Sequence, residues 1–183
     1  MNNTNAKIAE HSRQKLTQGL LGLMKTYSYA DITVTQIAQE AELSRKTFYR
    51  LYKNKDEILL GYIDSFINEF LAEIRTNELH HYWDTILLYF NFLKKQSEFL
   101  LLLKQNELLH LLMQKSYNAT FKILSITKPY RLTVQEDSCL PYGRAFSVGG
   151  VSCMIMKWVE DGMVIEPKII VDYLHYGLKS DGI

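Results

Sequence analysis

Residues 33–55 hold two short helical patterns joined by a tight turn, and the second pattern is basic and aromatic. Thr33 or Thr35 can cap the first helix. The inward positions of that helix are apolar, and two of them are small enough for a second helix to cross close by: Ile37, Ala38 and Ala41. Leu43 is expected to fill the turn. The segment therefore predicts a helix-turn-helix.

The second helix of this segment has two unlike faces. Ser44 can accept a hydrogen bond from the free amides at its start. Phe48, with Tyr52, is expected to point into the small core. The outward side chains are polar or basic: Arg45, Lys46, Thr47 and Tyr49. Residues 45–55 carry five cations and no acid, a concentration that attracts phosphates. A merely solvated basic face is the alternative, but capping, turn and apolar spacing together favour contact with DNA.

Residues 7–60 resemble the DNA-binding domain of the TetR family of bacterial transcriptional regulators, in the helix-turn-helix 37–44 and the recognition helix and exit 47–55. Glu42 departs from the pattern, because the family often has a glycine in this turn. If φ of Glu42 is positive, the turn carries a modest strain. The resemblance implies DNA contact by a set of side chains: Thr33, Thr35, Ser44, Arg45, Lys46, Thr47, Tyr49 and Lys55. Within this set Lys55, Thr33 and Thr35 are expected on the phosphate backbone.

Charge is distributed unevenly along the 183 residues. Residues 1–56 carry nine Lys or Arg against five acids, whereas residues 57–183 carry twelve against fifteen. We therefore expect a basic DNA-binding domain at 1–56 and a helical effector-binding and dimerisation domain at 57–183.

The two cysteines, Cys139 and Cys153, have no CxxC spacing and no clustered histidines. They predict buried thiols, with no zinc site and no disulfide framework. No charged leader precedes an apolar stretch, and no apolar run approaches the roughly 20 residues of a membrane helix. The sequence thus predicts a cytoplasmic protein with no membrane span, no metal and no cofactor.

Helical periodicity extends through the chain and predicts an all-α fold, with a three-helix DNA-binding domain followed by a helical ligand-sensing and dimerisation domain. Residues 7–27 form a helix with one apolar face: Leu16, Leu20, Leu23, Met24 and Tyr27. A helix over 56–74 should link the domains, with Asp56 and Glu57 in its first turn. Further helices are expected near 83–93 and at 97–105, 108–124, 141–160 and 168–178. Residues 126–140 are expected to form a loop.

Gly149 and Gly150 lie in the middle of a predicted helix, where each costs about 1 kcal/mol relative to alanine. Close approach of another helix would offset that cost. In TetR-family proteins the last two helices pair with those of a second subunit in a four-helix bundle. The resemblance therefore implies a homodimer on a palindromic operator, with this interface: Phe146, Gly149, Gly150, Cys153, Ile170, Tyr173 and Leu174. Packing within one subunit, or a pocket wall, is the alternative.

Of the 22 aromatic residues, 17 follow residue 56. They could line a cavity for a small, largely apolar effector, which predicts these pocket residues: Phe90, Met113, Tyr117, Phe121 and Trp158. A plain helical core is the alternative for each of them.

The first hypothesis for the function is a regulator, expected to be a repressor, that the effector releases from DNA. The second is a DNA-binding dimer whose C-terminal domain docks a protein partner. An enzyme is not expected, because no nucleophile with a base, paired carboxylates, phosphate loop or metal motif is present.

Overall fold

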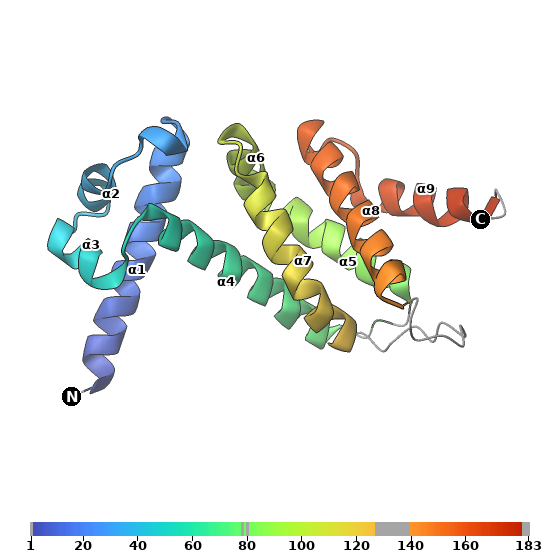
Figure 1. Ribbon diagram of the computed structural model, residues 1–183, viewed down its shortest axis with the longest axis horizontal. Helices are drawn as coiled ribbons and strands as arrows, with labels where there is room; N and C mark the ends of the chain where they lie inside the picture. Colours follow the sequence, from blue (N-terminus) through green and yellow to red (C-terminus); the bar gives the residue numbers. More distant parts are fainter. Residues whose placement is uncertain (1, 78, 80, 127–139, 181–183) are drawn as a thin grey trace. The chain divides into compact units, whose positions relative to one another are not determined.

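The computed structural model describes residues 2–77, 79, 81–126 and 140–180, and every regular element in these residues is helical. The all-α prediction is thereby confirmed. The chain divides into two compact units, Met1–Phe66 and Ile67–Ile183. Helix α4, Lys55–Thr76, begins in the first unit and ends in the second (Figure 1). The structural division thus falls inside α4, ten residues after the boundary expected at residue 56.

The N-terminal unit has four helices and one 3-10 turn: α1 (Asn2–Met24), η1 (Tyr29–Asp31), α2 (Val34–Glu40), α3 (Arg45–Leu51) and the first part of α4. Its core is formed by side chains that are fully buried: Leu16, Leu20, Met24, Ile37, Phe48 and Ile63. The prediction that Tyr27 belongs to the apolar face of the first helix is wrong, since Tyr27 is 48% exposed. The reason is that α1 ends at Met24, where turn hydrogen bonds such as Thr26 N to Leu23 O replace the helical pattern.

Close packing of α1 on α2 depends on Gly19. A Cβ atom at Gly19 would lie 3.3 Å from both the Ala41 nitrogen and the Ile37 oxygen. The backbones of the two helices therefore approach each other directly at this point. Ala38 and Ala41, which the sequence assigned to the crossing, are buried on α2 as expected.

The turn between α2 and α3 is a Schellman motif centred on Glu42. The Glu42 amide donates to Gln39 O at 2.9 Å, and the Leu43 amide donates to Ala38 O at 2.8 Å. This arrangement satisfies carbonyls at the end of α2, but it places Glu42 in the left-handed region at φ 55°. Glu42 also forms an exposed ion pair with Lys15 at 3.1 Å. The turn therefore forms without glycine, at the cost of backbone strain.

At position 42 the glycine variant should be more stable than the alanine variant, which is the reverse of their order inside a helix. Neither Glu42→Gly nor Glu42→Ala retains the pair with Lys15, so the comparison isolates the backbone. We expect Glu42→Gly to have the higher free energy of unfolding by about 1 kcal/mol, because only glycine adopts a positive φ without strain. At the exposed helical residue Gln39, alanine should be the more stable by about 0.5–1 kcal/mol. Urea unfolding of the four variants measures both differences, and the same sign at both positions would contradict the strain at Glu42.

In its described residues the C-terminal unit contains the end of α4 and five further helices: α5 (Tyr82–Lys95), α6 (Ser97–Gln105), α7 (Leu109–Ile126), α8 (Leu140–Glu160) and α9 (Pro167–Ser180). Helix α5 packs against α6 and α9, and α8 packs against α6 and α7. The core includes Phe90, Leu93, Leu100, Leu103 and Val159. The loop expected at 126–140 lies almost entirely outside the described residues, as does Cys139.

Candidate nucleic-acid interface

Two hydroxyl side chains begin the helices of the helix-turn-helix. Thr33 caps α2 in a capping box: its Oγ1 accepts from the Gln36 amide at 3.3 Å, and the Thr33 amide donates to Gln36 Oε1 at 2.8 Å. Ser44 caps α3, where its Oγ accepts from the Thr47 amide at 3.1 Å. Of the two predicted caps for α2, the structure selects Thr33, and Thr35 is an exposed residue of the helix. Both caps fix where the exposed face of each helix begins.

Helix α3 separates its buried and exposed side chains as the sequence predicts. Phe48 is fully buried, and its ring lies 6.2 Å from that of the half-buried Tyr52. Arg45 and Lys46 are exposed, and Tyr49 is 53% exposed. Thr47 is half-buried, with its hydroxyl oxygen 3.0 Å from Ser44 Oγ. The structure thus brings the predicted DNA contacts of α3 to the outer side of this helix; their contact with DNA stays a prediction.

Arg50 is exposed on the same side of α3 and was missing from the predicted contacts. It follows Lys46 by four residues, so the two lie one above the other on the helix surface. That spacing was visible in the sequence. The family resemblance implies contacts only up to Tyr49 on this helix, although Arg50 is one of the five cations of residues 45–55.

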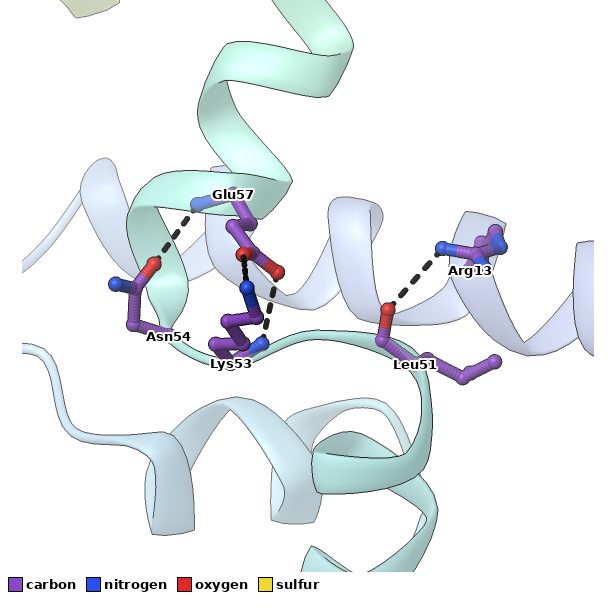
Figure 2. Close-up of polar contacts among 5 residues, drawn as sticks. All are labelled: Arg13, Leu51, Lys53, Asn54 and Glu57. Carbon is purple, nitrogen blue, oxygen red and sulfur yellow. Dashed lines mark hydrogen bonds and ion pairs between the residues drawn. The ribbon is translucent and has the colours of Figure 1, made fainter.

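The exit from α3 is held by polar contacts to α1 and α4. Arg13 of α1 donates to Leu51 O at 3.3 Å, which satisfies a carbonyl at the end of α3 (Figure 2). At the start of α4, Asn54 Oδ1 accepts from the Glu57 amide at 3.0 Å, and Glu57 Oε2 accepts from the Lys53 amide at 2.8 Å. These bonds cap α4 and fix the short link from α3, so the C-terminal end of α3 is held against α1 and α4.

Lys55 has a different environment from the one predicted. Its Nζ donates to three backbone carbonyls in η1 and just after it, Tyr29 O at 2.5 Å, Ile32 O at 2.9 Å and Ala30 O at 3.0 Å. An ammonium group has three protons, so these bonds use all of them. In this structure its ammonium binds the chain that precedes α2, and the contact of Lys55 with a DNA phosphate stays a prediction.

Tyr29 completes the same contact between η1 and α4. Its hydroxyl donates to Asp56 Oδ1 at 2.6 Å, and its ring centroid lies 4.7 Å from Lys55 Nζ. Burial, together with the hydrogen bond to Asp56, raises the pKa of Tyr29 above its ordinary value. The phenol therefore remains a donor across the physiological range, and the first turn of α4 holds the entry to α2.

Replacing Lys55 by methionine should lower the stability of the N-terminal unit. Methionine keeps the apolar stem but leaves three carbonyls without their charged donor, a loss of about 1.5–3 kcal/mol. Urea or thermal unfolding followed at the helix-turn-helix measures this loss. Unchanged stability, combined with weaker binding to every duplex and a salt dependence about one unit shallower, would contradict this structural role and support the phosphate contact of Lys55.

The predicted dimer interface lies mainly on exposed parts of α8 and α9. Phe146 is 81% and Tyr173 is 79% exposed. Gly149, Gly150 and Cys153 are exposed as well, which corrects the expectation of a buried Cys153 thiol for the protomer. Ile170 and Leu174 are half-buried.

The predicted pocket residues do not share one environment. Phe90 and Trp158 are buried and in contact, with ring centroids 5.2 Å apart, and Met113 is also buried. Trp158 donates its indole N–H to Ile165 O at 2.8 Å. Tyr117 is 48% exposed, and the side chain of Phe121 lies outside the described residues. Phe90, Met113 and Trp158 thus lie in the core of this unit, and their role in an effector pocket stays a prediction.

Comparison with known proteins identifies the class. An exposed basic helix following a capped helix and a tight turn defines a helix-turn-helix DNA-binding domain. Residues 18–62 match the family described as bacterial regulatory proteins, tetR family. The similarity to the TetR family thus lies in this N-terminal domain.

One curated relative is the HTH-type dhaKLM operon transcriptional activator DhaS of Lactococcus lactis subsp. lactis (strain IL1403). It is 32% identical over 84 residues, which are 46% of this chain and 43% of that protein. The match thus spans less than half the length of the relative. None of the helices in the described ranges is long and apolar enough to cross a lipid bilayer.

Two solved structures share the fold over nearly the whole chain. The fatty acid degradation regulator FadR from Bacillus halodurans has a TM-score of 0.66 at 15% identity, covering 93% of this chain and 96% of that one. The dihydroxyacetone kinase operon activator DhaS has a TM-score of 0.60 at 19% identity, covering 92% and 94%. At these identities the likeness concerns the fold alone.

Proposed function

We propose that this protein regulates transcription by binding a palindromic operator as a homodimer, with α3 of each protomer in the major groove. The observation that carries the proposal is the two-sidedness of α3. Phe48 is fully buried on one side, while Arg45, Lys46, Tyr49 and Arg50 are exposed on the other. An exposed helical face with three cations and no acid is suited to the acceptor-rich groove and the phosphates beside it.

Exposed apolar side chains on the last two helices support the homodimer. On α8 they are Tyr142, Phe146 and Met156, and on α9 they are Ile169, Tyr173 and Tyr176. Their spacing of three, four or ten residues places each set along one helix face. Apolar faces of this kind mark interaction surfaces. A Cβ atom at Gly149 or Gly150 would meet nothing within 4 Å, so a helix of a second protomer has room to approach closely there.

The C-terminal unit supplies the regulation in this proposal, and two kinds of signal are considered. A small apolar effector that released the operator would make the protein a repressor. A protein partner docked on the C-terminal unit would suit an activator, which is how both DhaS proteins are named. The direct contact between Phe90 and Trp158, where a pocket was expected, favours the second signal.

Selection of bound fragments from random duplex DNA tests the proposed function. The purified protein is incubated with the pool at low ionic strength, and recovered fragments are sequenced over several rounds. We expect enrichment of a palindrome whose half-sites are separated by about one helical turn, 10–10.5 base pairs centre to centre. Absence of any enriched sequence would contradict sequence-specific binding.

A further inference from the structure

The outward face of α3 is rich in hydrogen-bond donors. Arg45, Lys46 and Arg50 are exposed, and their guanidinium and ammonium groups donate but cannot accept. Helix α3 contains no Asp, Glu, Asn or Gln. Such a face complements base edges that present acceptors, and it offers little to the amino groups of cytosine or adenine.

The hydroxyl groups at the start of α3 are already used within the protein. Ser44 Oγ accepts from the Thr47 amide at 3.1 Å and lies 3.0 Å from Thr47 Oγ1. The contact between the two oxygens uses one of the two hydroxyl protons, and the Ser44 oxygen also caps the helix. Tyr49, which is exposed as well, carries a hydroxyl that can both donate and accept.

Lys46 and Arg50 are the cations best placed to reach bases. Each is two residues from the buried Phe48, so each points about 160° away from the core side of the helix. They are separated by about 6 Å along the axis. Neither has a hydrogen bond, ion pair or ring contact within the described part of the chain, whereas the Arg45 guanidinium lies 6.0 Å from the Tyr49 ring.

We propose that the operator half-site presents guanines to Lys46 and Arg50, which donate to the N7 and O6 atoms in the major groove. Guanine is the base that offers two adjacent acceptors on this edge, and Arg or Lys on guanine is the commonest specific contact. Their separation along α3 lets the two side chains address guanines on neighbouring base pairs. This inference rests on the proposed operator binding and adds the chemistry that the half-site must have.

Replacement of guanine N7 by carbon tests the assignment atom by atom. In a duplex selected by the wild-type protein, each half-site guanine is replaced singly by 7-deazaguanine, which keeps base pairing and phosphate charge. Fluorescence anisotropy gives the dissociation constants. We expect about tenfold weaker binding by the wild-type protein at each guanine that is read. For Lys46→Ala the replacement at its own guanine should cost nothing further, while the guanine of Arg50 remains sensitive, and Arg50→Ala should show the converse.

Lys53→Ala provides the matched control, because Lys53 is a strongly exposed cation outside α3. It should weaken binding to all duplexes alike and keep the full 7-deazaguanine effect.

Half-sites without guanine, or an equal 7-deazaguanine effect in wild type, Lys46→Ala and Arg50→Ala, would overturn the guanine assignment while leaving operator binding intact. If the wild-type protein selected no duplex, the proposed function and this inference would both fail. Thermal melting of each variant establishes that the fold is retained.

Discussion

Phe146→Asp combined with Tyr173→Asp is expected to give a folded monomer whose affinity for the operator is at least about 100-fold lower. Both side chains are almost fully exposed in the protomer, so their replacement should leave its fold intact. In a dimer they would be buried, and two carboxylates at the centre of an apolar interface are costly to desolvate. Loss of the second recognition helix then removes the avidity of two linked sites, an effect of 10²–10⁴.

Sedimentation velocity distinguishes the 21.4 kDa protomer from a dimer, and anisotropy on the selected duplex measures the affinity. Val164→Asp is the matched control, because Val164 is 76% exposed but belongs to neither helix. It should remain a dimer with wild-type affinity. A double variant that still sedimented as the dimer would place the interface on another surface.

Phe48→Ala should destabilise the N-terminal unit by about 3–5 kcal/mol. Phe48 is fully buried beneath α3, and its ring contacts those of Tyr49 and Tyr52. A loss of this size is a large part of the stability of a small domain. We therefore expect loss of helical signal from the helix-turn-helix and loss of operator binding, with the C-terminal unit still folded.

Tyr49→Ala changes the neighbouring residue and separates stability from recognition. Tyr49 is exposed, and we expect its removal to cost less than about 1 kcal/mol, mainly through the edge contact with Phe48 at 5.4 Å. Operator binding should nevertheless weaken. Circular dichroism in urea and anisotropy on the operator measure the two effects. An equal loss of stability in Phe48→Ala and Tyr49→Ala would contradict the placement of Phe48 on the buried side and Tyr49 on the exposed side of α3.

Local interactions made much of the N-terminal unit predictable from sequence. The caps at Thr33 and Ser44 bind amides three residues away, and the burial of Ile37 and Phe48 follows from helical spacing. The charge pattern likewise indicated the exposed face of α3. These features depend on residues within one or two helical turns of each other, so a single sequence contains the information.

Interactions between distant residues were not predictable in the same way. The carbonyls that bind Lys55 lie 23 to 26 residues earlier in the chain, and nothing in the sequence brings them together. The positive φ of Glu42 follows from the turn that joins α2 and α3. A glycine at this position would have indicated such a φ, but the sequence has a glutamate. Helix α8 has apolar residues on several sides, so periodicity could not decide that Trp158 is buried while Phe146 is exposed.

Hydroxyl-radical footprinting of the wild-type protein on its selected duplex tests most directly whether the outward face of α3 binds DNA twice per dimer. We predict two protected segments on one face of the duplex, with their centres separated by one helical turn or a whole number of turns. Combined Lys46→Ala and Arg50→Ala substitutions should abolish both segments together. A single protected segment, or protection that persists in the double variant, would contradict DNA binding through α3.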